Sequence, residues 1–254
     1  MSVPVLLLGG DGESTRIVYH RLARRFGMLP AIIEEPVSRQ AMLRVRLRRL
    51  GFFAVASQLA FMLGIRPLLA HAARERLAEI KSQYGLDGSP IPAQQLSHVF
   101  SVNGSETIEL LRRFDPKVIV VNGTRIISRK VLDSVPATFI NTHAGITPKY
   151  RGAHGGYWAL YNNDPARCGV TVHRVDPGID TGEIVGQTVI APASGDSFVT
   201  YPYLQIAAAL PLLEAAVQAA LDGTLESRAA AGETGVWYHP GIFQYLGGRL
   251  RGVR

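Results

Sequence analysis

Apolar residues along this chain gather in short continuous runs, and each run ends in a polar or glycine-rich turn. The clearest runs lie at residues 3–8, 117–121 and 137–140. Shorter or mixed stretches at 97–102 and 184–190 also predict strands, and 170–175 alternates apolar and polar residues. Runs of this length are typical of strands buried on both faces of a parallel sheet. Stretches with helical spacing separate several of them, at residues 15–26, 104–114, 157–162 and 201–221. We therefore predict an α/β protein with a Rossmann-like, open and mostly parallel sheet flanked by helices.

Residues 37–86 interrupt this alternation of strand and helix. The segment opens with four closely spaced arginines, continues with the apolar run 50–65, and is charged again over 71–84. We expect one or two long helices that pack on the sheet or on a second subunit, which leaves a homodimer open. The alternatives are a basic segment on an anionic membrane surface and a nucleic-acid site. Against them, Ser57 and Gln58 interrupt the apolar run short of the ~18 residues of a membrane span, and the arginines lack interleaved aromatic residues.

Composition and charge narrow the class of protein. Hydrophobic residues make up 47% of the 254 residues and charged ones 19%, as in a globular protein. A formal net charge of +7 favours anionic partners without choosing among them. The single cysteine, Cys168, excludes an internal disulfide and a cysteine zinc cluster. We expect one cytoplasmic domain over residues 1–254, with a helical insertion at 37–86 and a short tail at 224–254. We expect no nucleic-acid binding, and membrane contact is a possibility that we favour less than packing on the sheet or on a second subunit.

The first apolar run leads into the turn Gly9-Gly10-Asp11-Gly12, and a predicted helix follows. Backbone N–H groups and the helix dipole at such a turn favour anionic groups, and Ser14 or Thr15 can cap the helix. The dinucleotide-binding fingerprint is incomplete, because Thr15 stands where its third glycine belongs, although Glu34 and Glu35 could mimic its ribose-binding acid. A substrate or phosphate site, a nicotinamide site and a structural turn all stay open. The candidate residues of this turn are Gly10, Gly12, Ser14 and Thr15.

The run 137–140 ends in Asn141-Thr142-His143, and the run 170–175 breaks into Asp-Pro-Gly shortly before Asp180. Side chains alternate along a strand, so Asn141 and His143 share one face at its carboxyl end, where open α/β sheets bind ligands. An amide donor, an imidazole and a carboxylate can move protons around a carbonyl carbon and stabilise its oxyanion. Taken alone, a strand-end Asn or His is more often part of turn chemistry.

Further motifs complete the pattern. Pro148-Lys149-Tyr150-Arg151-Gly152 follows His143, and His173 precedes Asp180 by seven residues. Together these motifs resemble the formyltransferase family that uses 10-formyltetrahydrofolate, which includes glycinamide ribonucleotide transformylase, methionyl-tRNA formyltransferase and sugar-nucleotide N-formyltransferases. The resemblance covers residues 117–187 well and the first strand and its turn loosely. It implies an enzyme of the formyltransferase class with 10-formyltetrahydrofolate as formyl donor.

The resemblance also implies roles for individual residues. The catalytic residues would be Asn141, as donor to the oxyanion, His143, as proton relay, and Asp180, which orients and charges the imidazole. The implied folate contacts are Arg125, Ile126, Ile127, Asp176 and Gly178, and the implied acceptor contacts are Gly10, Gly12, Ser14, Thr15, His154 and His173. One departure is clear, because Ala144-Gly145 stands where the family usually has Pro-Ser.

We expect formyl transfer to a primary amine of a small, phosphorylated acceptor, either glycinamide ribonucleotide or an amino-sugar nucleotide. Methionyl-tRNA is disfavoured because that branch adds a C-terminal domain, and the deformylase because it adds an N-terminal one. The alternative from another class is a non-catalytic folate- or nucleotide-binding module that docks to a partner or a membrane through residues 37–86. No metal site is expected at His143, His173 and Asp180, because the Asn-first order favours acyl chemistry.

Overall fold

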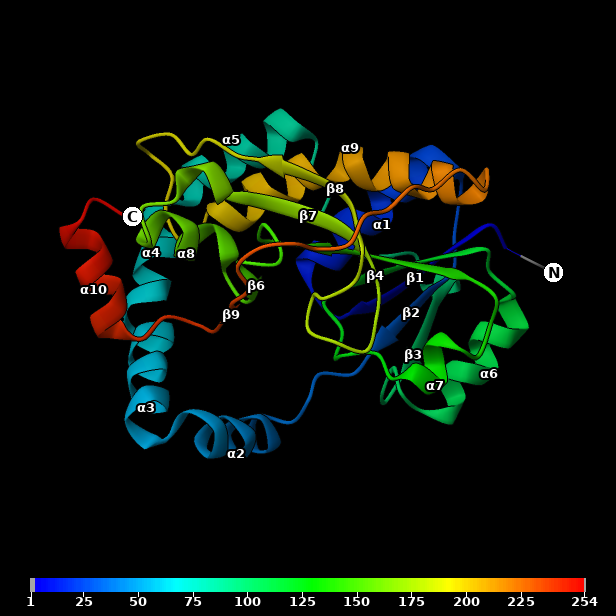
Figure 1. The fold of residues 1–254 in the computed structure, drawn as a ribbon, viewed down its shortest axis with the longest axis horizontal. Helices are drawn as coiled ribbons and strands as arrows, with labels where there is room; N and C mark the ends of the chain where they lie inside the picture. Colours follow the sequence, from blue (N-terminus) through cyan, green and yellow to red (C-terminus); the bar gives the residue numbers. More distant parts are fainter. Residues whose placement is uncertain (1–2, 254) are drawn as a thin grey trace.

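Seven strands form one sheet in the order β3-β2-β1-β4-β5-β7-β8 (Figure 1). The computed structural model describes residues 3–253. The strands of this sheet are β1 (Val5–Gly10), β2 (Ala31–Glu34), β3 (Leu96–Val99), β4 (Val118–Asn122), β5 (Thr138–His143), β7 (Gly169–Arg174) and β8 (Ile184–Val189). The pairs from β3 through β5 are parallel, whereas β7 and β8 are antiparallel additions. The predicted Rossmann-like, mostly parallel sheet is therefore confirmed.

Helices cover both faces of the sheet. Over the described residues the helices are α1 (Glu13–Phe26), α2 (Arg39–Leu50), α3 (Phe52–Ala60), α4 (Arg66–Ala72), α5 (Arg74–Tyr84), α6 (Ser105–Phe114), α7 (Arg129–Leu132), α8 (Gly155–Tyr161), α9 (Tyr201–Leu221) and α10 (Ile242–Leu250). Alternation along β1 sends Val5 and Leu7 to the core under α1 and α9, and Leu6 and Leu8 to the core under α6 and α7. Both sides of β1 are apolar because both are buried.

A third, aromatic core lies beyond the sheet edge and ties the C-terminal tail to the rest. Its buried rings are Phe61, Tyr150, Tyr157, Trp158, Phe198, Tyr201 and Tyr245. The tail also contributes β9 (Val236–Trp237), which pairs in parallel with β6 (Arg151–Gly152) in a small second sheet. The tail therefore helps to position the chain segment that follows β5. That all these parts act as a single domain stays a prediction.

The insertion is helical, as expected, but it is divided into more pieces. A π-helical turn at Phe61–Ile65 joins α3 to α4. Helix α5 is anchored by ion pairs, from Arg76 to Asp196 at 2.9 Å and from Lys81 to Glu13 at 2.6 Å. Helix α2 instead leaves most of its side chains exposed. It lies at the lower edge of Figure 1, away from the sheet.

We expected the apolar run 50–65 to pack on the sheet or on a second subunit. Within the chain itself several of its large side chains stay exposed, so their burial against a second subunit stays a prediction. Phe52 and Phe53 are 70% and 87% exposed, and Leu63 is also exposed. Only Val55, Gln58 and Phe61 of this run are buried. The physical reason is geometric, since a helix at the periphery of the fold has a single inward face to bury.

The turn after β1 also differs from expectation in one detail. The residue before α1 is Gly12, and neither Ser14 nor Thr15 caps the helix. Both hydroxyl groups are instead directed to Asn122 at the end of β4, with Ser14 Oγ 3.0 Å and Thr15 Oγ1 3.2 Å from Asn122 Oδ1. These bonds join the ends of two neighbouring parallel strands, which is where the candidate site lies.

Candidate functional site

Strands β5 and β7 bring polar side chains together at the carboxyl end of β5. Their register pairs Asn141 with His173, and Asn141 Nδ2 lies 3.1 Å from His173 Nε2. His173 Nδ1 lies 2.7 Å from the carbonyl oxygen of Arg174, to which it donates. In the tautomer that carries its proton on Nδ1, the Nε2 atom accepts from the Asn141 amide. This arrangement orients the amide and leaves its second N–H able to donate to a ligand.

His143 lies between two oxygen acceptors. Its Nε2 is 2.7 Å from the carbonyl oxygen of Tyr150, and its Nδ1 is 3.2 Å from Asp180 Oδ2. Because a carbonyl oxygen only accepts, Nε2 carries a proton, and a second proton at Nδ1 would be held by the carboxylate. Asp180 Oδ1 lies 3.6 Å from His173 Nε2. The side chains of Asn141, His143, His173 and Asp180 thus form one group, which we call the strand-end cluster.

Burial and charge act in opposite directions on this cluster. Burial lowers the pKa of His143, and the negative charge of Asp180 offsets only part of that effect. Burial also opposes ionisation of Asp180, but its contacts with His173, His143 and the Gly152 amide outweigh the effect of burial, so the pKa of Asp180 is lowered. At neutral pH an ionised Asp180 therefore faces a neutral His143, whose Nδ1 is poised to take up a proton.

The loop after β7 holds Asp180 in place. Asp180 adopts a left-handed backbone conformation with φ of 49°, which costs energy for a residue other than glycine. Its carboxylate accepts the backbone N–H of Gly152 at 3.0 Å. Within the loop, the Asp176 carboxylate accepts the backbone N–H of Gly178 at 3.1 Å and the hydroxyl of Thr181 at 2.7 Å. Asp176 therefore shapes the turn that presents Asp180.

Gly145 makes the contact between His143 and the Tyr150 carbonyl possible. A Cβ atom at position 145 would collide with that carbonyl oxygen and lie 2.7 Å from His143 Nε2. A Cβ atom on Gly155 would lie 2.6 Å from the Cα of Gly145. The serine usual at this position in the formyltransferase pattern would not fit here. The Ala144-Gly145 departure thus goes together with a loop that closes tightly over the imidazole.

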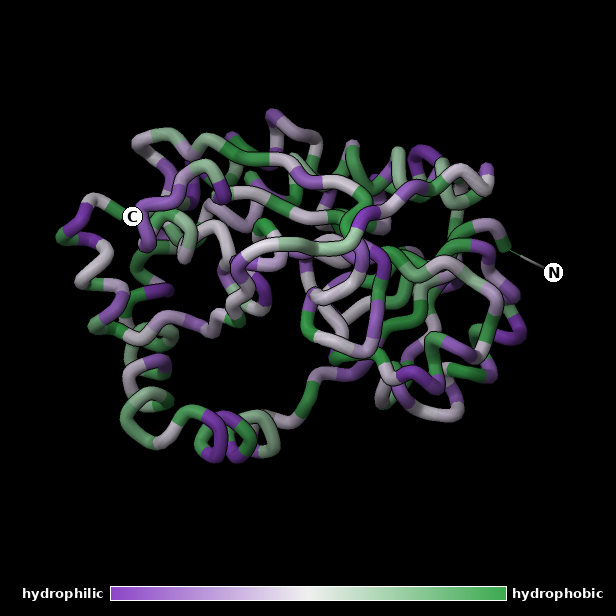
Figure 2. The backbone as a smooth tube through the Cα atoms, viewed as in Figure 1, coloured by the Kyte–Doolittle hydropathy of each residue, from purple (hydrophilic) through white to green (hydrophobic). Residues whose placement is uncertain are grey.

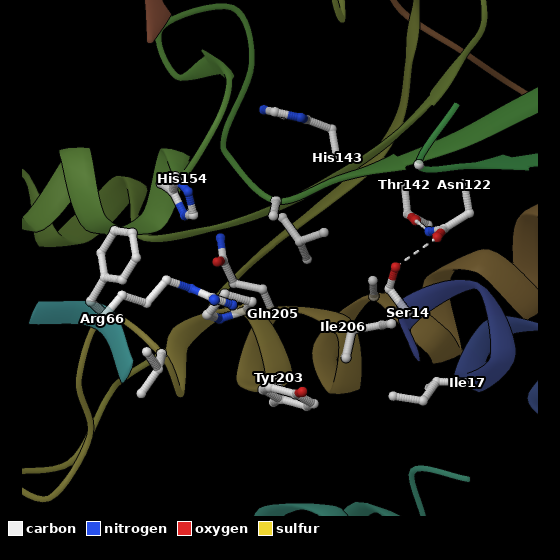
Figure 3. Close-up of a pocket in the computed structure, with 17 residues that line it drawn as sticks. Ser14, Ile17, Arg66, Asn122, Thr142, His143, His154, Tyr203, Gln205 and Ile206 are labelled. Atoms are coloured by element: carbon white, nitrogen blue, oxygen red, sulfur yellow. Dashed lines mark hydrogen bonds between the residues drawn. The ribbon is translucent and has the colours of Figure 1, made fainter. Parts of the chain in front are cut away.

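Two cavities flank His143. The larger, of about 400 Å³, lies against α9, and we call it the α9 cavity (Figure 3). Its polar side chains are Ser14, Arg66, Asn122, Thr142, His143, His154, Tyr203 and Gln205. Among the described residues that line it, none is an aspartate or a glutamate. Arg66 extends from α4 towards Gln205 in this cavity and supplies its one permanent positive charge (Figure 3).

The second cavity, of about 320 Å³, lies under the loop after β7, and we call it the loop cavity. Its lining includes the whole strand-end cluster together with all five residues implied as folate contacts, which are Arg125, Ile126, Ile127, Asp176 and Gly178. Arg125 is held by an ion pair of 2.9 Å to Glu34 and donates to the Phe100 carbonyl oxygen at 2.9 Å. Glu34 is thereby occupied, which removes it as the acid of a dinucleotide site.

The implied acceptor residues are divided between these surroundings. Ser14 and His154 line the α9 cavity, and His173 lines the loop cavity. Thr15 is buried against Asn122, and Gly10 packs so closely on Gly123 that a Cβ atom would collide with its carbonyl oxygen. Gly12 immediately precedes α1. Gly10, Gly12 and Thr15 are thus placed to shape the turn, with Ser14 as its contact to the α9 cavity.

His154 pairs with a histidine of the tail that the sequence pattern did not single out. His154 Nε2 lies 2.8 Å from His239 Nδ1. Burial, with His239 and Arg66 nearby, lowers the pKa of His154 to about 3. Burial, with Arg46 and Arg66 nearby, lowers the pKa of His239 to about 4. Both rings are neutral at physiological pH, so one donates to the other and neither serves as a cation in the α9 cavity.

Three more residues that line the α9 cavity could not be predicted from the sequence. Arg66, Tyr203 and Gln205 reach the α9 cavity from helices far away in sequence. No local motif marks them, and the Ala- and Leu-rich sequence of α9 predicts only a helix. Over the described residues 3–253, no group of three or more histidine, cysteine, aspartate or glutamate side chains is arranged to hold a metal ion. The cluster is instead equipped to donate to an oxyanion and to exchange a proton.

Comparison with known proteins points to one family. Residues 80–202 match the family model described as formyl transferase. Over 116 residues, the chain is 35% identical to the methionyl-tRNA formyltransferase of Agathobacter rectalis, a match that covers 43% of this chain and 37% of that protein. The chain therefore matches less than half the length of this curated relative.

Solved structures resemble the fold over almost the whole chain. A likely sugar N-formyltransferase from Mycobacterium tuberculosis aligns with a TM-score of 0.59 at 16% identity, over 98% of this chain and 87% of that one. Glycinamide ribonucleotide transformylase 1 from Symbiobacterium toebii gives 0.54 at 17% identity, over 90% and 95%. An N-formyltransferase from Helicobacter canadensis, in complex with folinic acid and dTDP-3-aminofucose, gives 0.53 at 13% identity, over 92% and 71%. At these identities the likeness concerns the fold.

Proposed function

We propose, from the premise that residues 80–202 belong to the formyl transferase family, that the chain is an N-formyltransferase. It takes the formyl group from 10-formyltetrahydrofolate and transfers it to a primary amine. The observation that carries this proposal is the position of His143, which lines both cavities at the end of β5. A donor in one cavity and an acceptor in the other would meet at this residue.

The strand-end cluster supports the chemistry of such a transfer. When the amine attacks the formyl carbon, the carbonyl oxygen becomes an oxyanion, to which the second N–H of Asn141 donates. One such donor typically lowers the barrier by roughly 3 kcal/mol. His143 Nδ1 receives a proton of the attacking nitrogen, and the Asp180 carboxylate, 3.2 Å away, stabilises the imidazolium. The intermediate then releases the folate N10, which takes that proton, and the acceptor leaves as a formamide.

The loop cavity suits the folate, and the α9 cavity suits the acceptor. The loop cavity joins the apolar side chains of Ile126 and Ile127 to the polar cluster. In the α9 cavity, Arg66 is positive, no described lining residue is acidic, and Ser14 and Gln205 add hydrogen-bonding groups. This balance favours an acceptor that carries a phosphate as well as the amine. We therefore propose a phosphorylated amine such as glycinamide ribonucleotide or an amino-sugar nucleotide, with Arg66 added to the turn at Gly10–Thr15 as the anion contact.

The curated relative acts on methionyl-tRNA by its name, and the net charge of +7 would suit an RNA acceptor. The α9 cavity, at about 400 Å³, is of a size that fits a small molecule. We therefore propose a small acceptor, and we test methionyl-tRNA as the alternative acceptor.

One assay tests the proposal. The protein is incubated with 10-formyltetrahydrofolate and a panel of amines, each offered with and without its phosphate, and with methionyl-tRNA, while the release of tetrahydrofolate is measured. We expect turnover with a phosphorylated amine and a lower kcat/KM for its unphosphorylated partner. Turnover with methionyl-tRNA and with none of the small amines would show that the acceptor is methionyl-tRNA and not a phosphorylated amine. Heat protection by reduced folate without turnover on any amine would favour a binding module instead, and NAD serves as the control ligand.

A further inference from the structure

The helix that runs from Phe52 to Ala72 presents an apolar outer face to solvent. Only 17% of its most apolar window is buried, against 39% for α9, and both are long and apolar enough to cross a membrane. Its exposed large apolar side chains are Phe52, Phe53, Leu59, Leu63 and Leu68. Within α3, Phe52 and Leu59 are seven positions apart and so lie on one side of the helix. Monomeric soluble proteins rarely leave so large an apolar surface uncovered.

The inner face of this helix is already in use. Gln58 is buried and its side-chain amide donates to the carbonyl oxygen of His239 at 2.8 Å. Phe61 is fully buried, with its ring centroid 5.0 Å from that of Phe198 and 4.9 Å from that of Tyr245. Crossing a bilayer would expose both sides of the helix to lipid and would require these contacts to break. The helix can therefore lie on an apolar medium, but it cannot span one while the fold is intact.

The neighbouring helices add positive charge and further apolar side chains. From residue 36 to residue 74 the sequence has seven arginines and neither aspartate nor glutamate. Helix α2 exposes Leu43, Arg44, Leu47 and Arg48, and its tube in Figure 2 alternates between purple and green. None of these four lines the cavity described next, whereas Met42, Val45 and Arg49 do. A cavity of about 550 Å³ separates α2 from β9, so α2 is not packed onto the sheet.

Helix α10 extends the same edge of the molecule (Figure 1). It contacts α3 and exposes Phe243 and Leu250, which are 79% and 90% exposed. After Glu233 the sequence again contains no acidic residue. We call the exposed side chains of α2, the helix Phe52–Ala72 and α10 the basic apolar face.

We propose that the basic apolar face docks the protein on an anionic lipid surface, with the helix Phe52–Ala72 lying in the plane of the interface. Charge complementarity decides between the possible occupants. A second copy would bring one arginine-rich, acid-free face against another, and the repulsion would oppose association. An anionic headgroup layer attracts each arginine while phenylalanine and leucine enter the acyl boundary. Arg66, on the same helix, lines the α9 cavity, so that the docked protein would hold this cavity near the lipid surface.

Co-sedimentation of the full chain with vesicles tests this proposal. We expect binding to vesicles of equimolar phosphatidylcholine and phosphatidylglycerol, and little binding to phosphatidylcholine alone. The double substitution Arg44→Gln/Arg48→Gln should weaken binding by about tenfold or more. The matched control is Arg112→Gln/Arg113→Gln on α6, which removes the same charge from exposed positions elsewhere. Binding should also fall as salt rises to about 0.5 M.

A second pair of variants tests the apolar part. Phe53→Ser should weaken binding by at least about tenfold, whereas Met28→Ser, at a residue 75% exposed elsewhere, should leave it unchanged. Equal binding to neutral vesicles, absence of binding, or an equal effect of both arginine pairs would overturn the proposal. A stable dimer that buries Phe53 without vesicle binding would assign the face to a second copy. None of these readouts depends on formyl transfer, so the proposal stands or falls separately from the proposed reaction.

Discussion

The end of β5 and the helices at 39–84 differ in which side chains they bury: the first buries polar side chains, and the second leaves large apolar side chains exposed. At the end of β5, polar side chains are buried or half-buried and each has a partner within hydrogen-bonding or ion-pairing reach, as the buried His143 has in the half-buried Asp180. In the insertion, large apolar side chains such as Phe52 and Phe53 remain in solvent, beside arginines. The first arrangement fixes atoms in place for chemistry. The second leaves a surface that gains free energy only when something covers it.

The difference assigns separate tasks to the two regions. The sheet fixes the geometry of the reaction, because the register of β5 and β7 determines the distance between Asn141 and His173. The insertion contributes Arg66 to the α9 cavity and the basic apolar face to the surroundings. Changes in the cluster should therefore affect kcat, and changes in the insertion should affect what is bound and where.

The largest effect is expected at the strand-end cluster. Asn141→Ala, His143→Ala and Asp180→Ala should each lower kcat about a hundredfold or more, since each removes a group that acts on the transition state. The fold should persist, as checked by circular dichroism and by heat protection with reduced folate. Near-normal turnover in any two of these variants would refute the assignment. Ser194→Ala, at an exposed position outside both cavities, is the control.

Much of this region could be predicted from the sequence. The apolar runs gave the strands, and alternation placed Asn141 and His143 on one face at a strand end, as the structure has them. The loop after β7 was also marked, by Asp176 and Asp180. The loop around Gly145 could not be predicted, because its shape depends on how closely the Tyr150 carbonyl and Gly155 approach. Such approaches are set by tertiary packing and leave no period in the sequence.

The insertion was harder to predict for a related reason. Apolar composition predicts burial, but a peripheral helix buries only the side that faces the fold, and composition does not say which residues those are. Phe61 is buried in the aromatic core while Phe53 is exposed. The position of Arg66 in the α9 cavity, and of His239 beside His154, likewise depends on contacts between distant segments.

A substitution at Gly145 tests whether the tight loop supports the cluster. Gly145→Ser should lower kcat by roughly tenfold to a hundredfold, because its Cβ displaces the Tyr150 carbonyl from His143 Nε2. Thermal stability should fall as well. Gly195→Ala is the matched control, since a Cβ there meets no atom within 4 Å. Unchanged kinetics in the serine variant would mean that the family's usual residue is tolerated and that the loop does not constrain the imidazole.

A smaller and more selective effect is expected at Arg66. Arg66→Met should raise KM for a phosphorylated acceptor by about tenfold, through loss of one charge-assisted contact, while kcat changes little. The unphosphorylated partner of the same amine should be unaffected. Arg74→Met, an exposed arginine outside the α9 cavity, is the control. A fall in kcat with unchanged KM would instead mean that Arg66 acts in the chemical step. The insertion would then contribute to the reaction as well as to binding.

The smallest effect is expected at His154 and His239, where the start of α8 meets the tail. The folded-state pKa values, about 3 and about 4, lie below the ordinary value of 6.5. As the pH falls below about 6.5, these histidines therefore bind protons in the unfolded chain but stay unprotonated in the folded protein. The free energy of unfolding contributed by this pair is complete above pH 6.5 and is lost as the pH falls towards 4.

Thermal melts over this range should show Tm falling, and the double variant His154→Asn/His239→Gln should show a shallower fall. Asparagine suits the left-handed backbone of residue 154, where φ is 59°. His71→Gln, at an exposed position, is the control and should leave the slope unchanged. Equal slopes for the double variant and the unchanged protein would show that this pair does not govern the acid sensitivity, and that carboxylates such as Asp180, whose pKa is lowered, account for it.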